Sequence, residues 1–165
     1  MKQLKTIINT VKQILAFMLQ KLLLKSGYGL LAVQPLVRRK AEQLIERMFA
    51  KGRAVMVYQG YRSEEEQNYL YAQGRSRKGP IVTNARGGES LHNYGVAIDV
   101  VFLVNGHPSW DNGHDWNLLG KEGKTLGFEW GGDWKEFPDR PHFQFMGSYT
   151  LDDFKNKRID YSRYE

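Results

Sequence analysis

The chain has 165 residues, which is enough for one domain with a substantial hydrophobic core. Hydrophobic residues make up 41% of it and aromatic residues 13%, a composition that excludes a largely disordered protein. The absence of cysteine excludes disulfide bonds, cysteine-based zinc sites and a thiol nucleophile.

The positive charge of the chain is confined to its N-terminal third. The net charge is +6, but residues 1–53 hold 11 Lys and Arg against 2 Asp and Glu, whereas residues 54–165 hold 13 against 16. A basic end favours anionic partners such as phospholipid headgroups, wall polymers or nucleic acid. No nucleic-acid-binding motif accompanies the charge, so we expect no nucleic-acid partner. The alternative is a solvated surface that needs no partner.

Residues 1–26 form a basic and apolar segment of their own. Apolar residues recur there at helical spacing: Ile7, Ile8, Val11, Ile14, Leu15, Met18, Leu22 and Leu23. This pattern predicts a basic amphipathic helix on an anionic membrane surface, and a helix packed on the domain is the alternative. The lysines leave no uncharged run of about 18 residues, which argues against a membrane span. Lys21 also interrupts the apolar region expected of a signal peptide, and no clear cleavage site follows it.

The first elements after this segment are predicted from apolar periodicity. Residues 35–50 have the spacing of a helix with one buried face, and Gly52 follows its end. The residues expected on that face are Val37, Ala41, Leu44, Ile45 and Met48. Residues 53–59 alternate in the manner of a strand.

Ser63 and Glu66 have the spacing of a capping box, which predicts a helix from about residue 64 to residue 73. Gly74 would end this helix. Residues 74–90 are rich in Gly, Arg and Ser, and we expect a long loop near the functional site.

The last third of the chain predicts less regular structure. Residues 115–126 favour a helix, residues 130–138 a loop containing Gly and Trp, and residues 148–165 a tail packed on the surface. The order of short strands and helices lacks a regular βαβ alternation. It therefore predicts an α+β fold with a small antiparallel sheet.

Two histidines and a carboxylate can converge on two neighbouring strands. His92 precedes a turn-prone Asn-Tyr-Gly stretch, and residues 96–102 read as a strand that carries Asp99 on the face away from its apolar residues. Pro141 suits the first residue of a second strand, in which His142 faces away from the core.

This set has the composition of a catalytic zinc site. Three protein ligands, His92, Asp99 and His142, would leave one coordination position for a water whose pKa falls to about 7. Asp139, three residues before His142, would stand beside that water as a general base. Each residue also has a plain alternative: Asp99 could cap a loop and His142 could be a satisfied core histidine. The combination is much more specific than its parts.

The motif resembles the zinc signature of the VanY-like D-Ala-D-Ala carboxypeptidase family, most closely its L-alanyl-D-glutamate peptidases from phage endolysins and bacterial cell-wall hydrolases. The signature reads Ser-x-His-x-x-Gly-x-Ala-x-Asp from Ser90 to Asp99, with Asp-x-x-His at Asp139 to His142. Further matching stretches are residues 59–63, 71–75, 81–88 and 130–134. The resemblance covers roughly residues 27–147, with no departure at the metal or base positions. It implies a peptidase domain over residues 27–165, with a central antiparallel sheet that carries zinc and helices beside it.

Arg62 follows a predicted strand and precedes a helix cap, so it can project into a cleft. Its guanidinium could hold a substrate carboxylate or stabilise an oxyanion, and the family resemblance implies a role of that kind. The alternative is a surface arginine paired with Glu65 or Glu66. We expect Ser90, Gln67 and Arg86 to contact substrate.

Four further polar residues could form another metal site but are expected at the surface. They are His107, Asp111, His114 and Asp115, which lie in one predicted loop.

The residues predict a zinc peptidase, and the family resemblance implies that it cleaves the L-Ala–D-Glu bond of peptidoglycan stem peptides. We expect peptidoglycan as its partner and a monomer as its state. Asp139 would take a proton from the attacking water, and Arg62 would hold the substrate or the oxyanion. The alternatives are a D,D-carboxypeptidase or dipeptidase, a non-catalytic wall- or metal-binding module, and a zinc-dependent nuclease. Retention of Asp139 argues against the binding module, because holding zinc does not require it. We expect the enzyme to act in the cell wall, outside the cell or in the periplasm. It would be associated with the membrane surface, or would stay in the cytoplasm until phage-type release.

Overall fold

The computed structural model describes residues 32–165, so the expected N-terminal helix within residues 1–26 lies outside the described residues. The core of the fold is a five-stranded antiparallel sheet with the order β1-β2-β5-β4, and β3 pairs with β2. The strands are β1 (Val55–Gln59), β2 (Ala97–Val104), β3 (His107–Ser109), β4 (Glu129–Trp130) and β5 (His142–Gln144). Among the described helices, none is long and apolar enough to cross a membrane. The predicted α+β class is confirmed.

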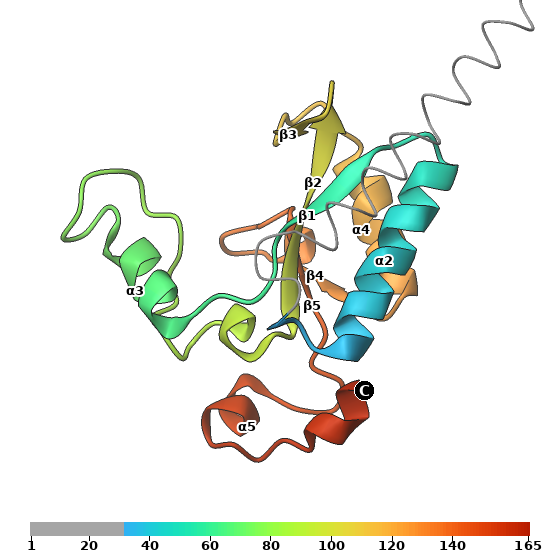
Figure 1. The fold of residues 1–165 in the computed structure, drawn as a ribbon. Helices are drawn as coiled ribbons and strands as arrows, with labels where there is room; N and C mark the ends of the chain where they lie inside the picture. Colours follow the sequence, from blue (N-terminus) through green and yellow to red (C-terminus); the bar gives the residue numbers. More distant parts are fainter. Residues whose placement is uncertain (1–31) are drawn as a thin grey trace, which may run out of the picture.

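Helices α2 (Pro35–Ala50) and α4 (Trp116–Thr125) lie together on one side of the sheet (Figure 1). Proline at its start suits α2, because the first helical N–H has no partner within the helix. The five residues predicted for the buried face of α2 are the five that the structure buries. In α4, Trp116 and Leu119 enter the same core, and Asp115 caps the helix by accepting from the backbone N–H of Leu118.

Strand β2 is the centre of the sheet and has two different faces. Ile98, Val100 and Phe102 are buried in the core, while Asp99 points from the opposite face. The antiparallel pairing sets Asp99 directly opposite His142 of β5. The sheet register therefore fixes two of the predicted ligands side by side, as the sequence indicated.

Helix α3 (Glu64–Ala72) and the loop after it form a lobe apart from the two core helices (Figure 1). The predicted capping box is present: the Ser63 hydroxyl accepts from the N–H of Glu66, and the Glu66 carboxylate accepts from the N–H of Ser63. The remainder of the long loop, as far as residue 90, leads back to the 3-10 helix η2 (Leu91–Tyr94) that carries His92.

Two predictions for the last third of the chain were wrong in detail. The expected loop of residues 130–138 begins with the end of β4 and continues into the 3-10 helix η3 (Gly131–Asp133). A strand of two residues is too short to show periodicity, and it exists because β5 pairs with it. The expected surface tail contains α5 (Leu151–Lys155) and η4 (Tyr161–Tyr164), whose Phe154 and Tyr164 are each only 1% exposed. This segment is thus part of the core.

Candidate metal centre

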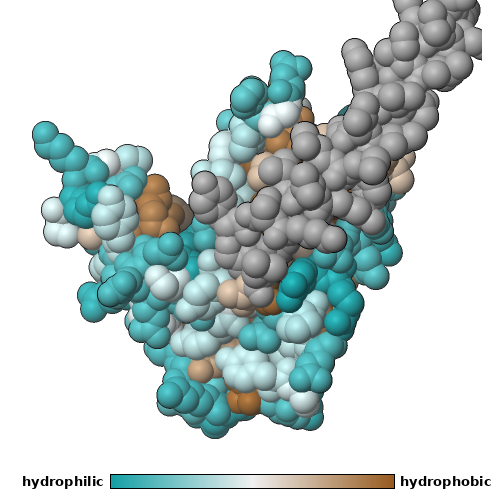
Figure 2. Space-filling view, viewed as in Figure 1, coloured by the Kyte–Doolittle hydropathy of each residue, from teal (hydrophilic) through white to brown (hydrophobic). Residues whose placement is uncertain are grey.

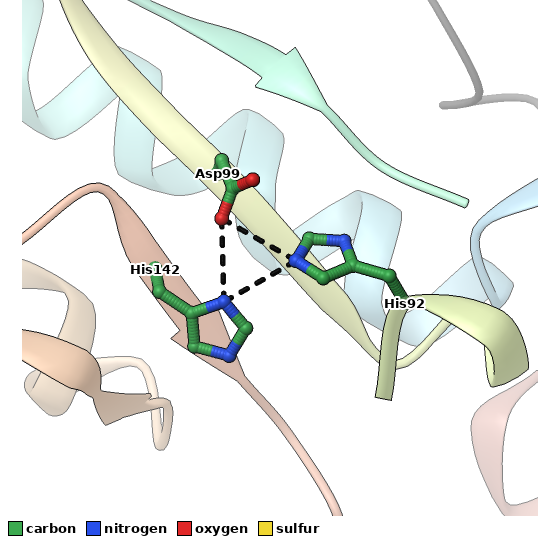
Figure 3. A group of neighbouring side chains, drawn as sticks. All are labelled: His92, Asp99 and His142. Atoms are coloured by element: carbon green, nitrogen blue, oxygen red, sulfur yellow. Dashed lines mark hydrogen bonds and ion pairs between the residues drawn. The ribbon is translucent and has the colours of Figure 1, made fainter. Parts of the chain in front are cut away.

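The side chains of His92, Asp99 and His142 meet at one point, from η2, β2 and β5 (Figure 3). His92 Nε2 lies 3.2 Å from His142 Nδ1 and 3.3 Å from Asp99 Oδ1, and His142 Nδ1 lies 3.2 Å from the same carboxylate oxygen. Within the described part of the chain, these three residues are the group whose donor atoms come close enough to share a metal ion.

The backbone around His92 explains why its ring points into the site. Gly95 follows η2 with φ +69°, and a Cβ there would come within 2.7 Å of the carbonyl oxygen of Ala32. Glycine is the residue that adopts this conformation without strain, and it turns the chain from η2 into β2. The carbonyl of His92 also accepts a hydrogen bond from the N–H of Arg62 at 3.1 Å, which ties η2 to the end of β1.

The outer nitrogen of each imidazole has a hydrogen-bond acceptor. His92 Nδ1 lies 2.7 Å from the carbonyl oxygen of Gly60, and His142 Nε2 lies 3.2 Å from Oε1 of Gln144. Because a carbonyl oxygen can only accept, each of these nitrogens carries a proton. A ring that holds its single proton on the outer nitrogen presents a lone pair at its inner nitrogen, as metal-binding histidines do.

The charges at the centre favour a cation. Burial alone would raise the pKa of Asp99, but His92 and His142 hold this pKa below its usual range. Burial alone would lower the pKa of His142, but the carboxylate of Asp99 beside its inner nitrogen raises this pKa above the ordinary value. Two lone pairs and a carboxylate that face one another repel unless positive charge lies between them.

The geometry fits a zinc ion in particular. Zinc bonds of about 2.0–2.1 Å in a tetrahedron separate neighbouring ligand atoms by about 3.3–3.4 Å. The three separations here, 3.2, 3.2 and 3.3 Å, are close to that edge length. The donor set of two nitrogens and one oxygen leaves the fourth position for water or substrate.

Asp139 lies beside the centre without belonging to the cluster of three. The N–H of Asp139 donates to the carbonyl of Gly131 at 3.0 Å, and the N–H of His142 donates to the carbonyl of Asp139 at 3.2 Å. A Cβ on Gly131 would lie 2.5 Å from the Asp139 carbonyl oxygen, so only glycine allows this close approach. Burial and the nearby charge of Asp99 raise the pKa of Asp139, which makes it a better proton acceptor than an exposed aspartate.

Arg62 also reaches the centre. Its Nη2 lies 3.5 Å from Asp99 Oδ2, and its Nη1 donates to Oε1 of Gln67 at 2.8 Å. The alternative partner Glu66 is engaged in the helix cap, where it accepts from Ser63. The structure thus holds the guanidinium at the metal centre.

Gln67 has a different position from the one predicted. It is completely buried, so it does not line the cleft. Its Nε2 donates to the carbonyl of Ala85 at 2.8 Å and to the Thr83 hydroxyl at 3.2 Å, while its Oε1 holds Arg62. One amide therefore links the long loop to the arginine. Nothing in the sequence indicated that Gln67 is buried, because glutamine is usually a surface residue.

The other predicted substrate residues divide into two groups. Ser90 lines a cleft of about 710 Å³ together with His92 and Asp139. Arg86 is absent from that lining and lies over the ring of Tyr71, 5.1 Å from its centre. The proposed direct contact between Arg86 and substrate therefore lacks support from the cleft.

The four polar residues expected at the surface have local roles. The ring of His114 stacks on Phe102 with 4.5 Å between ring centres, and its Nε2 lies 2.7 Å from the Ser109 hydroxyl. Asp111 accepts from the N–H of Gly113, Asp115 caps α4, and His107 is exposed on β3.

Fold and site together define a metallopeptidase of the M15 type, and the chain belongs to that family. The matching family model is described as D-alanyl-D-alanine carboxypeptidase and covers residues 83–145, which include all three cluster residues and Asp139. Within the family, the chain is 47% identical over 123 residues to the peptidoglycan L-alanyl-D-glutamate endopeptidase CwlK of Bacillus subtilis (strain 168), a match that covers 69% of this chain and 74% of CwlK.

Two other relatives agree with this placement, and a third protein shares the fold. The L-alanyl-D-glutamate peptidase of Listeria phage A118 is 32% identical over 120 residues, which are 69% of this chain and 38% of that longer protein. The crystal structure of the L-Ala D-Glu endopeptidase ChiX of Serratia marcescens has a TM-score of 0.55 at 25% identity, covering 74% of this chain and 84% of ChiX. VanYB in complex with D-alanine-D-alanine shares the fold, with a TM-score of 0.54 at 19% identity and coverage of 80% and 81%.

Proposed function

We propose that the chain is a zinc-dependent endopeptidase that hydrolyses the L-Ala–D-Glu bond of peptidoglycan stem peptides. The observation that carries the proposal is the cluster of His92, Asp99 and His142, with Asp139 and Arg62 beside it, in a chain 47% identical to an enzyme of that name. A zinc ion held by the three residues would polarise the scissile carbonyl and lower the pKa of a water molecule.

The residues around the cluster supply the remaining chemistry. Asp139 takes a proton from the attacking water and passes it to the leaving amine of D-Glu. Arg62 pairs with a substrate carboxylate or with the oxyanion that forms at the carbonyl, and Gln67 holds it in position. Trp134 covers His142, with 5.1 Å between ring centres, and limits the access of water to this side of the centre.

The shape of the cleft favours an endopeptidase over a carboxypeptidase. A second groove, of about 890 Å³, meets the first one at the metal centre, and the two share Val82, Asp99, Trp134 and Asp139. Substrate can therefore extend away from the centre on both sides. A carboxypeptidase needs one closed end with a cation for the terminal carboxylate, and this arrangement argues for the internal bond.

The place of action follows from the substrate. We propose that the enzyme works in the cell wall as a monomer, in lysis or in wall remodelling. The basic segment of residues 1–26 remains a proposed contact to an anionic membrane or wall polymer. The proposed action in the cell wall and the proposed contact of residues 1–26 are independent of each other.

A synthetic stem pentapeptide with an amidated C-terminus separates the alternatives. An endopeptidase cuts it as well as the free acid, releasing a fragment that begins with D-Glu. A D,D-carboxypeptidase requires the free carboxylate and would release terminal D-Ala from the unblocked peptide alone. A D,D-dipeptidase would cut neither pentapeptide and would hydrolyse the dipeptide D-Ala-D-Ala. A chain that binds purified peptidoglycan without releasing any fragment would support the non-catalytic module, and cleavage of DNA alone would support the nuclease.

A further inference from the structure

We propose that the groove lined by Tyr58, Trp110 and Trp134 binds the N-acetylmuramic acid residue to which the stem peptide is attached. This inference rests on the proposed function and adds a sugar-binding subsite to it. L-Ala is the first residue of the stem and is joined to the lactyl group of that sugar. An enzyme that cuts after L-Ala must therefore have the glycan close to its active centre.

The groove has the surface that a sugar ring requires. Tyr58 is 44% exposed, Trp110 48% and Trp134 38%, so each leaves a large part of its apolar ring accessible. The rings of Tyr58 and Trp110 meet edge to face, with 4.8 Å between their centres, so they form one continuous wall. Exposed apolar area gathered in a concave site marks a binding surface.

Polar groups accompany the aromatic wall. Arg140 and Asn112 line the same groove, and Nη1 of Arg140 donates to the side-chain oxygen of Asn112 at 3.2 Å. A pyranose ring has apolar C–H faces and a rim of hydroxyl and acetamido groups. The aromatic rings would pack on its faces, and these two side chains would bond to its rim.

The sheet aims Tyr58 into the groove. The pairing of β1 with β2 is regular up to Val57, opposite Val100, and then shifts, so that Gln59 stands opposite Asp99. Tyr58 is the extra residue of this irregularity. Bulges of this kind occur next to active sites and redirect a side chain. Tyr58 thereby reaches a groove that also contains Asp99.

The position of Arg62 gives the substrate a direction. Arg62, which suits the carboxylate of D-Glu, lines the groove that holds His92 and Ser90 and is absent from the groove of Tyr58 and Trp110. The peptide beyond the cleaved bond therefore occupies the Arg62 side. L-Ala and the sugar then occupy the groove of Tyr58 and Trp110.

The distance between the cleaved bond and the sugar is short enough for one groove to hold both. One residue of extended chain spans about 3.3–3.6 Å, and only L-Ala separates the cleaved carbonyl from the lactyl group. One groove is lined both by Asp139 and Trp134, at the metal centre, and by Tyr58 and Trp110, which form its aromatic wall. Figure 2 shows the molecule hollowed between the lobe that carries α3 and the end of the sheet at β3, next to which Trp110 lies.

Two substrates with the same peptide test this subsite. One is the stem peptide with N-acetylmuramic acid on L-Ala, and the other is the stem peptide with a plain N-acetyl group there, which keeps the amide and the charge. We expect the wild-type enzyme to have a higher kcat/KM on the muramyl peptide, mainly through a lower KM. Trp110→Ala should reduce this preference about threefold to tenfold, the range expected for loss of one aromatic contact.

Two control variants make the result specific. Trp110→Phe keeps an aromatic face and should retain most of the preference for the sugar. The ring of Tyr161, in η4, is 41% exposed and lines neither groove. Tyr161→Ala should therefore leave the preference for the muramyl peptide unchanged.

The outcomes separate the subsite from the proposed function. Equal kcat/KM on the two peptides, or an equal loss on both in Trp110→Ala, would overturn the sugar subsite and leave the peptidase standing. An equal loss on both peptides would mean that the groove contacts the peptide itself. Cleavage of neither peptide would overturn the proposed function and the subsite together.

Discussion

Asp99 and His142 stand directly opposite each other in the antiparallel pairing of β2 with β5, with 3.2 Å between Asp99 Oδ1 and His142 Nδ1. Opposite residues of two paired strands point to the same face of a sheet. The register that buries Ile98 beside Phe143 therefore places these two ligands on the other face. A shift of one residue would separate them, so core packing and the metal centre depend on the same pairing.

Removal of one histidine should remove the metal. We expect His92→Ala to purify with little zinc, because two remaining ligands hold the ion weakly, and to lose hydrolysis to the level of chelator-treated wild type. Metal analysis of the purified proteins measures this, and His107→Ala, on exposed β3, is the matched control. A His92→Ala protein with one full equivalent of zinc and normal turnover would show that the cluster is not the metal site.

Loss of the proposed base should leave the metal in place. Asp139→Asn keeps the shape of the side chain but cannot accept a proton. We expect kcat to fall by about 10²–10⁴-fold, the usual contribution of a general base, with unchanged zinc content. Steady-state kinetics and metal analysis of the same preparation measure both. If zinc were lost along with activity, Asp139 would have to be reassigned as a ligand.

Gln67 should act through Arg62 and the long loop. Gln67→Leu removes the acceptor for Arg62 and the donor to Ala85, leaving buried groups unpaired at a cost of about 1–3 kcal/mol in stability. We expect kcat/KM to fall about tenfold or more with the zinc content unchanged. Gln67→Glu keeps an acceptor for Arg62 and should retain more activity than the leucine variant.

A purely structural role of Gln67 would give a different pattern. The two variants would then lose kcat/KM in proportion to their loss of stability, measured by urea unfolding. Gln43→Leu, at an exposed position of α2, provides the control for a Gln-to-Leu change away from the site.

The sequence predicted the parts of this protein that local patterns determine. The buried face of α2 follows from apolar spacing, the capping box of α3 from Ser63 and Glu66, and the approach of the histidines to Asp99 from strand alternation. The spacing of Asp139 from His142 suggested the base, and the position of Arg62 after a strand, supported by the family resemblance, suggested its role.

The predictions that failed concern parts of the fold that depend on contacts between distant segments. Strand β4 exists because β5 pairs with it, and Gln67 is buried because loop residues 83 and 85 come to meet it. The C-terminal segment joins the core through Phe154 and Tyr164, two apolar positions too widely spaced to show a period.

The burial of Tyr164 gives a prediction for stability at high pH. Burial, with the neighbouring Tyr149 and Tyr161, raises the pKa of Tyr164 to about 12, and its hydroxyl donates to the carbonyl of Met146 at 2.6 Å. In the unfolded chain the tyrosine titrates near 10. The unfolded state therefore loses its proton first, so this contribution to stability is complete below pH 10 and is lost as the pH rises from 10 through 12.

Urea unfolding at several pH values measures this effect. The free energy of unfolding of the wild type should fall more steeply above pH 10 than that of Tyr164→Phe, which has no proton to lose. Equal slopes for the two proteins would contradict the burial of Tyr164 as a neutral group.

Mass spectrometry of fragments released from purified peptidoglycan is the most decisive test of whether this metal centre cleaves the bond between L-Ala and D-Glu. We expect stem peptides with new D-Glu amino termini, glycan strands that retain L-Ala, and neither product in the presence of a chelator. Release of free D-Ala without any new D-Glu amino terminus would contradict this expectation and would assign the chain to the carboxypeptidases.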